Sequence, residues 1–277
     1  MSETTSVIPA APSAPASQGK VVVSIRKVSK KFSNGTLAVR DVDLDLHAGE
    51  FLSLLGPSGC GKSTLLRMIA GLGETSAGTI VWPQSANMGA EAGAGAHGGE
   101  LGFVFQEPTL MPWATALANV VMPLKLKGVP TGEAKSQASE MLANVGLGSF
   151  LKSYPRELSG GMKMRVSIAR ALVTAPRLLL MDEPFAALDE ITRHKLNDDL
   201  LRLWERQHFT AVFVTHSVFE SVYLSERIVV MAARPGRIMA DLRVDAPYPR
   251  DEIFRTSADY GRLCRTASDA LKQAIAS

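Results

Sequence analysis

The sequence predicts an α/β fold, in which helices cover the faces of a parallel sheet. Short apolar runs alternate with helix-length segments along most of the 277 residues. One of these runs leads through a glycine-rich loop directly into a helical segment. The content of 46% hydrophobic and 21% charged residues is that of an ordinary globular chain, and no run reaches the ~20 apolar residues that cross a bilayer.

The first third of the chain predicts a tail and the edge of an antiparallel sheet. Residues 1–19 are rich in Ala, Pro, Ser and Thr and lack the features of a secretory signal, so we expect a disordered tail. A β-branched run at 21–26 and the alternation at 42–46 predict two antiparallel strands, and 78–82 is a further strand candidate. This part forms an N-terminal antiparallel β subdomain.

The parallel core begins between those strands. The apolar run 51–55 predicts a strand that stops at Gly56, and residues 62–69 predict a helix that Gly71 ends. Further strands are expected at 101–105, 178–181, 211–214 and 228–231.

A helical insertion interrupts this alternation. Residues 88–100 are mostly Gly and Ala, which predicts a flexible surface loop. Residues 107 to about 157 look helical despite several prolines, and with the start of a helix at 162–173 they form an insertion over about 107–168.

Charge and cysteine content narrow the function classes. The chain has 30 Lys and Arg against 27 Asp and Glu, a net charge of +3 that is too small for a duplex-binding arm, so we expect no nucleic-acid partner. Cys60 and Cys264 are too few for a disulfide framework and indicate a reducing compartment. We expect one domain over residues 20–245 and a tail of one or two amphipathic helices over 246–277.

Residues 56–64 match the phosphate-binding pattern G-x-x-x-x-G-K-[ST], between a predicted strand and a predicted helix. The glycines let the backbone curl so that its N–H groups and the helix N-terminus point at phosphates. Lys62 would reach the terminal phosphates, and Ser63 would bind Mg²⁺. The alternative is a glycine-rich turn without a ligand. The candidate nucleotide-binding residues of this loop are Gly56, Pro57, Ser58, Gly59, Cys60, Gly61, Lys62, Ser63 and Thr64.

Two carboxylates end the apolar strand 178–181. Asp182 and Glu183 fall where a parallel sheet presents charge to a ligand. Asp182 is the candidate to hold the metal together with Ser63, and Glu183 is placed to orient or deprotonate an attacking water. The alternative is that both acids cap the next helix.

A second anion-binding helix start is predicted at residues 158–162. The Ser159 hydroxyl and the N–H groups of Gly160 and Gly161 would face an anion there. Two phosphate sites on one chain are explained if two chains pair head to tail, each nucleotide lying between Lys62 of one chain and Ser159 of the other. The alternative is a serine N-cap with close backbone packing.

Together these motifs resemble the nucleotide-binding subunits of ATP-binding cassette (ABC) transporters, over about residues 20–240. The resemblance implies a P-loop NTPase fold with an inserted helical signature subdomain, and ATP with Mg²⁺ as ligands. The loop 56–64 is similar to the family's Walker A, residues 158–162 to its signature, and residues 178–183 to its Walker B.

Four single residues extend the resemblance. It implies that Gln106 touches the metal and relays movement to a membrane partner, that Asp189 belongs to the nucleotide-facing D-loop, and that His216 contacts the γ-phosphate. Phe32 occupies the place of the aromatic that stacks on adenine. The alternatives are a structural histidine after a strand and a partly buried aromatic at a strand end.

Three segments, 106–113, 181–189 and 231–238, resemble the bacterial importers for nitrate, sulfonates, taurine, bicarbonate and pyrimidines. The resemblance implies a dimer of ATPase subunits that closes around two Mg·ATP and drives separate integral membrane permease subunits. A homodimer is expected, and a pair of two different cassettes is the alternative. The chain would lie peripherally at the cytoplasmic face of the inner membrane, and a periplasmic or lipoprotein solute-binding protein would act with it indirectly. Trp113 is expected either to contact the permease or to lie in the core.

Other functions are compatible with the phosphate loop alone. An exporter ATPase and a soluble mechanochemical ATPase share the phosphate loop, and so does a small-molecule phosphotransferase, which the signature and His216 disfavour. The transported solute is not encoded in this chain, because it would meet the permease and not the ATPase.

Overall fold

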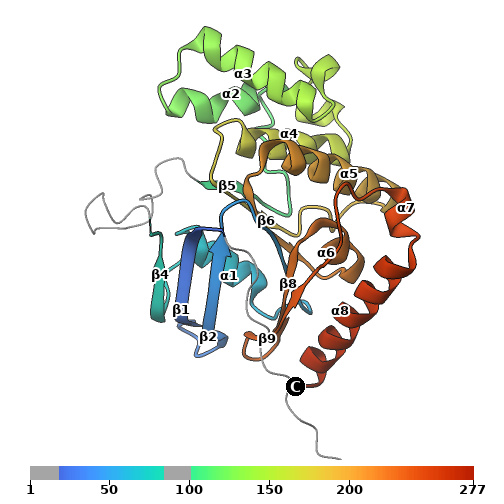
Figure 1. Cartoon of the computed structure of the whole chain (residues 1–277). Helices are drawn as coiled ribbons and strands as arrows, with labels where there is room; N and C mark the ends of the chain where they lie inside the picture. The colour runs from blue at the N-terminus through green and yellow to red at the C-terminus, as the bar shows by residue number, and fades with distance from the viewer. Residues whose placement is uncertain (1–18, 84–100) are drawn as a thin grey trace, which may run out of the picture.

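Two sheets and a helical lobe make up the computed structural model, which describes residues 19–83 and 101–277 (Figure 1). The smaller sheet has the strand order β2-β1-β4, and both pairs are antiparallel. Its strands are β1 (Val21–Lys31), β2 (Leu37–His47) and β4 (Ala77–Val81). The predicted antiparallel subdomain is confirmed. β1 and β2 are longer than the sequence pattern indicated, and β4 begins and ends one residue earlier.

The larger sheet has the strand order β5-β6-β7-β3-β8-β9. The first five strands are parallel, as predicted, and β9 pairs antiparallel with β8 at one edge. The strands are β3 (Phe51–Leu55), β5 (Leu101–Val104), β6 (Leu178–Asp182), β7 (Thr210–Thr215), β8 (Arg227–Ala232) and β9 (Arg237–Arg243). β9 was not predicted, because an edge strand that is half exposed and poor in β-branched residues has no strong sequence signal.

Both faces of the central strands β3, β6, β7 and β8 are buried, which explains their uninterrupted apolar runs. Phe51 and Leu55 of β3 belong to a core that includes residues of α4, α5, α6 and α8, whereas Leu52 and Leu54 belong to a second core with α1 and the smaller sheet. The helices are α1 (Lys62–Ile69), α2 (Ala116–Leu126), α3 (Thr131–Asn144), α4 (Gly160–Leu172), α5 (Glu190–Gln207), α6 (Val218–Leu224), α7 (Glu252–Arg255) and α8 (Ala258–Ala276).

The helical lobe lies above the sheets and consists of α2, α3 and two 3₁₀ turns packed on α4 (Figure 1). The expectation that helix begins at residue 107 is wrong, because the first helix begins only at Ala116. The preceding segment is held by side chains: Met111 N donates to Asn119 Oδ1 (2.8 Å), and Arg170 donates to the carbonyls of Pro108 and Thr109.

Pro123 does not break α2, which continues to Leu126. A proline removes one helical hydrogen bond. Burial of Val120, Val121 and Leu124 holds the helix together nevertheless, since tertiary packing supplies most helical stability.

The expected tail at 1–19 and the Gly/Ala-rich loop at 88–100 lie outside the described residues, except for Gly19. At the other end, α7 and α8 form two helices, and α8 places Cys264 and Ala267 in the core. Within residues 19–83 and 101–277, no helix is long and apolar enough to cross a membrane.

Candidate functional site

The predicted site residues converge at the carboxyl edge of the larger sheet. Gly56 follows β3, Asp182 ends β6, and His216 follows β7; these strands are neighbours in the order β6-β7-β3. Parallel strands deliver their carboxyl ends to one edge, where α/β folds bind ligands. Residues more than a hundred positions apart thereby meet.

The phosphate loop has a backbone that turns into α1. Gly61 caps α1 in the left-handed region (φ 93°), and a Cβ there would lie 2.8 Å from the Ala38 carbonyl oxygen. Lys62 is 3% exposed, and its Nζ donates to the carbonyls of Gly56 (2.8 Å) and Pro57 (3.0 Å). The loop thus encloses a buried cation at the N-terminus of a helix, an arrangement that favours anions.

Ser63 and Asp182 meet next to this cation. The Ser63 hydroxyl donates to Asp182 Oδ1 at 2.6 Å. Burial raises the pKa of Asp182, against the hydrogen bond from Ser63. A buried carboxylate of this kind is stabilised in its ionised form by a nearby cation.

Glu183 lies between a cation and an imidazole. Its Oε1 is 3.5 Å from Lys62 Nζ, and its Oε2 is 3.1 Å from His216 Nδ1. Its backbone has φ 45°, a conformation that non-glycine residues adopt at a cost and that gathers at functional sites. The carboxylate is partly exposed (18%), so that water has access to it.

The remaining predicted residues are not joined to this cluster by hydrogen bonds or ion pairs in the described part of the chain. Gln106 is exposed just after β5, the neighbour of β6. Phe32 follows β1 and is 44% exposed. Lys30 Nζ lies over its ring, 5.7 Å from the ring centre. The backbone N–H of Thr192 donates to Asp189 Oδ1 (2.9 Å), so Asp189 caps α5. The same cap hydrogen bond lowers the pKa of Asp189.

The serine–glycine start of α4 lies in a different part of the fold from the phosphate loop. Ser159 caps α4 by accepting from Met162 N (3.3 Å), and Ser159 and Gly160 are exposed. α4 packs on α2, α3, α5 and β5, whereas α1 packs on β2 and β6. The phosphate loop at α1 and the serine–glycine start of α4 are therefore two separate candidate anion sites.

Comparison with known proteins agrees with this geometry. The sequence profile described as ABC transporter matches residues 39–186. The chain belongs to the ABC transporter family. An uncharacterized ABC transporter ATP-binding protein of Methanocaldococcus jannaschii is 43% identical over 92% of this chain and 93% of its own length.

Two further matches concern function. An aliphatic sulfonates import ATP-binding protein of Bacillus cereus is 44% identical over 84% of this chain and 90% of its own length. A solved dimeric cassette in a post-hydrolysis state, bound to ADP and Pi, matches with a TM-score of 0.70 and 32% identity over 81% of this chain and 100% of its own. The chain is an ABC-type ATPase that binds and hydrolyses ATP.

The residues present fit Mg²⁺ as well as the nucleotide. Mg²⁺ prefers oxygen ligands and is held by one or two carboxylates together with substrate phosphates and water. Ser63 and Asp182 supply such oxygens at the phosphate loop. The described residues contain no cluster of three His, Cys, Asp or Glu side chains that would form a protein-only metal cage.

Gly236 supports the phosphate loop of this ABC ATPase from outside the predicted motif. Its N–H donates to the Ala38 carbonyl (3.0 Å), and a Cβ at Gly236 would lie 2.1 Å from the Cys60 carbonyl oxygen. The turn between β8 and β9 therefore touches the loop backbone.

Replacing Gly236 by alanine is expected to push on the phosphate loop. We expect a loss of about 1–3 kcal/mol of stability, as for other overpacked sites, and weaker ATP binding, measured by thermal unfolding and nucleotide titration. Gly73→Ala is the matched control, because nothing lies within 4 Å of a Cβ there. Equal unfolding temperatures of the two variants would contradict the expectation.

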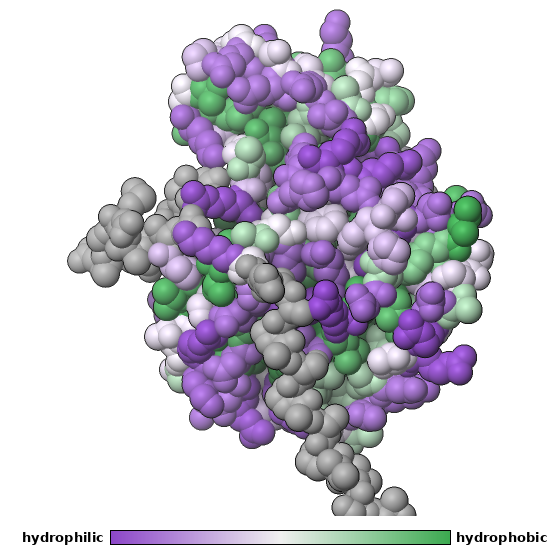
Figure 2. Space-filling model, viewed as in Figure 1, coloured by the Kyte–Doolittle hydropathy of each residue, from purple (hydrophilic) through white to green (hydrophobic). Residues whose placement is uncertain are grey.

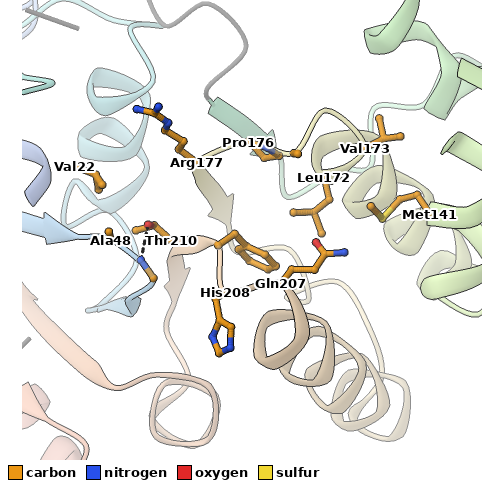
Figure 3. Close-up of a pocket in the computed structure, with 13 residues that line it drawn as sticks. Val22, Ala48, Met141, Leu172, Val173, Pro176, Arg177, Gln207, His208 and Thr210 are labelled. Carbon is orange, nitrogen blue, oxygen red and sulfur yellow. Dashed lines mark hydrogen bonds between the residues drawn. The ribbon is translucent and has the colours of Figure 1, made fainter. Parts of the chain in front are cut away.

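A cavity of about 580 Å³ lies at the opposite edge of the sheet and is not the nucleotide site (Figure 3). It is lined from the amino ends of β6 and β7 by Pro176, Arg177 and Thr210, and from the end of α4 by Leu172. Thr210 Oγ1 accepts from Gly49 N at 3.0 Å, the dashed line of Figure 3. The phosphate loop is at the other ends of these strands.

Thr215 and Glu220 form a polar pair next to His216 that no sequence motif predicted. Thr215 and Glu220 are buried, and the Thr215 hydroxyl donates to Glu220 Oε2 at 2.5 Å. Residues 217–220 match the helix-start pattern S-x-x-E, in which Glu would return to the Ser217 N–H. This pattern could have identified Glu220 from the sequence. In the fold, however, the Glu220 carboxylate accepts from the Thr215 hydroxyl and not from the Ser217 N–H.

Proposed function

We propose that this chain is the ATPase subunit of an importer, which powers a separate membrane permease for a small anionic or pyrimidine-like solute. The observation that carries the ATPase part is the cluster of Lys62, Glu183 and His216 at the carboxyl edge of the sheet. The importer part rests on the similarity to sulfonate import ATP-binding proteins, whose names state that activity.

In the proposed reaction, water attacks the γ-phosphorus of ATP in line, and ADP leaves. Glu183 accepts the proton from that water, which its partly exposed carboxylate can reach. His216 lies against Glu183 and holds it toward the γ-phosphate, and Lys62 binds the terminal phosphate oxygens. Catalysis of this kind depends on positioning and on stabilising charge.

Mg²⁺ would neutralise charge on the β- and γ-phosphates when bound. Ser63 and Asp182 are proposed to hold it, with Gln106 as an additional oxygen ligand from the end of the adjacent strand β5. Phe32 is proposed to stack on the adenine, for which its half-exposed ring is available.

We further propose that two copies pair head to tail. Ser159, Gly160 and Gly161 lie away from the phosphate loop of their own chain. Ser159 and Gly160 are exposed, whereas Gly161 is buried beside Thr192, and this helix start would complete the partner's nucleotide site. Asp189, exposed at the start of α5, would face the same interface. The dimeric cassette with ADP and Pi supports this pairing by similarity.

We propose that the permease contacts the helical lobe and the segment that leads into it. Trp113, just before α2, and Leu126, at the end of α2, are 77% and 81% exposed, so the Trp113 side chain lies at the surface and not in the core. Figure 2 shows hydrophobic patches among the hydrophilic side chains of this lobe. Large apolar side chains that are exposed at this end of the molecule are available for a partner surface. The chain would then lie peripherally at the cytoplasmic face of the membrane, and a solute-binding protein would reach only the permease.

A single-cysteine crosslink tests the proposed function. The native Cys60 and Cys264 are buried, so an introduced cysteine reacts alone. Trp113→Cys should crosslink to a co-purifying multi-span permease, whereas Ile253→Cys, with 78% exposure at the native residue, should not. ATP hydrolysis without any permease crosslink would favour a soluble mechanochemical ATPase, and solute efflux by the reconstituted complex would favour an exporter.

A further inference from the structure

His216 is the first residue of a two-residue connection between β7 and α6. Thr215 is the last residue of β7, and Ser217 caps α6, so the direction of the His216 side chain depends on how β7 passes into α6. Residues 215–217, here called the switch turn, carry the imidazole of His216. Side chains that hold this turn therefore control the position of His216.

Three hydrogen bonds close a ring around the switch turn. Ser217 N donates to Thr215 Oγ1 (3.0 Å), Glu220 N donates to Ser217 Oγ (3.3 Å), and Thr215 Oγ1 donates to Glu220 Oε2 (2.5 Å). Thr215 and Glu220 are 2% and 8% exposed. Burial raises the pKa of Glu220, against the Thr215 hydrogen bond and the charge of Arg193. One oxygen of the buried Glu220 carboxyl is thus hydrogen-bonded to the switch turn.

The second oxygen of Glu220 faces α5. Arg193 Nε is 3.7 Å from Glu220 Oε1, and neither atom has a hydrogen-bond partner in the described part of the chain. Both residues, with Asn197 of the next helical turn, line a cavity of about 570 Å³. Arg193 Nη2 donates to the Leu188 carbonyl at 3.0 Å, directly before Asp189. One guanidinium therefore touches both the Glu220 carboxyl and the segment that carries Asp189.

We propose that Glu220 and Arg193 are positioning residues for His216: Glu220 holds the switch turn through Thr215, and Arg193 ties that turn to the segment carrying Asp189. Neither side chain is bonded to the phosphate loop, so both act through His216. The inference rests on the proposed function, in which His216 acts beside Glu183 at the γ-phosphate. A small displacement of a catalytic group has a large effect on rate.

The test compares Glu220→Ala, Glu220→Gln, Arg193→Gln and Arg202→Gln in the full chain. Arg202 lies on α5, as Arg193 does, pairs with Asp199 at 2.8 Å and is 62% exposed, so Arg202→Gln is the matched control for Arg193→Gln. Arg193→Gln should lower kcat without changing the Kd for ATP, and a wild-type kcat there would remove Arg193 from the proposal. Glu220→Ala should lower kcat for ATP about tenfold with an unchanged Kd for ATP. Glu220→Gln retains an acceptor for the Thr215 hydroxyl, so its kcat should be within about threefold of the wild-type value. Arg202→Gln should have the wild-type kcat.

A spectroscopic readout separates positioning from a merely structural role. The imidazole ¹⁵N signals of His216 should change in Glu220→Ala and remain near those of the wild type in Arg202→Gln. Wild-type kcat in Glu220→Ala, or a loss of kcat with unchanged His216 signals, overturns the inference. If Glu220→Ala does not fold, Thr215→Val takes its place, because valine has the same shape as threonine and lacks the hydroxyl. Thr215→Val should lower kcat in the same way. A wild-type kcat in Thr215→Val overturns the inference. Failure of the wild-type chain to bind ATP would instead refute the proposed function.

Discussion

Glu183→Gln is expected to lower kcat for ATP hydrolysis by about a hundredfold or more, since general-base catalysis contributes on that order. Glutamine has the size of glutamate and still offers an oxygen to His216 Nδ1, now 3.1 Å from Glu183 Oε2. It cannot accept a proton from water. ATP binding should persist, because Lys62 and the loop backbone are unchanged. The variant should therefore accumulate as an ATP-bound dimer. Light scattering with and without ATP measures its molecular mass.

Glu252→Gln is the control for this experiment. Glu252 is exposed in the first turn of α7, far along the chain from the cluster, and its variant should hydrolyse ATP at the wild-type rate. A Glu183→Gln protein that keeps half of the wild-type kcat would exclude Glu183 as the base. A monomer at saturating ATP would count against head-to-tail pairing in the absence of the permease.

Lys62→Ala is expected to weaken ATP binding about a hundredfold, the equivalent of two tenfold steps at 1.4 kcal/mol each. Hydrogen bonds to charged groups contribute about 1.5–3 kcal/mol, and Lys62 Nζ is the buried cation of the loop. Removing Lys62 also removes the ion pair between its Nζ and Glu183 Oε1, which are 3.5 Å apart. The rate of hydrolysis should therefore fall together with the affinity for ATP.

Isothermal titration with Mg·ATP measures this loss. The control is Lys272→Ala, which removes an exposed lysine paired with Asp269 on α8 and should bind ATP as the wild type does. Thermal unfolding of both variants shows whether the loop still folds. A Lys62→Ala protein with wild-type affinity would mean that the phosphates are held elsewhere.

Local patterns carried most of the fold prediction. The strand 51–55 and the helix 62–69 were predicted with the bounds that the structure has, because the strand is buried on both faces and the helix is delimited by Gly61 and Gly71. The insertion was predicted less well. Residues 107–115 are fixed by hydrogen bonds to Asn119 and Arg170, and contacts of that kind have no periodicity in sequence.

The sequence by itself determined the phosphate loop, since its glycines, Lys62 and Ser63 lie within nine consecutive residues and their chemistry is local. It also marked Asp182, Glu183 and His216 as residues that follow strands. Strand order decided that they meet, because β6, β7 and β3 are neighbours in space and not in sequence.

Only the tertiary structure decided which groups support that site. Gly236 must be small because it meets the Cys60 carbonyl across the fold, and Glu220 turns from its own helix start to the Thr215 hydroxyl. Arg193 reaches Glu220 from another helix. Such contacts depend on how helices pack on the sheet, and the free energy of packing is set by shape and burial in three dimensions, which no short pattern of residues encodes.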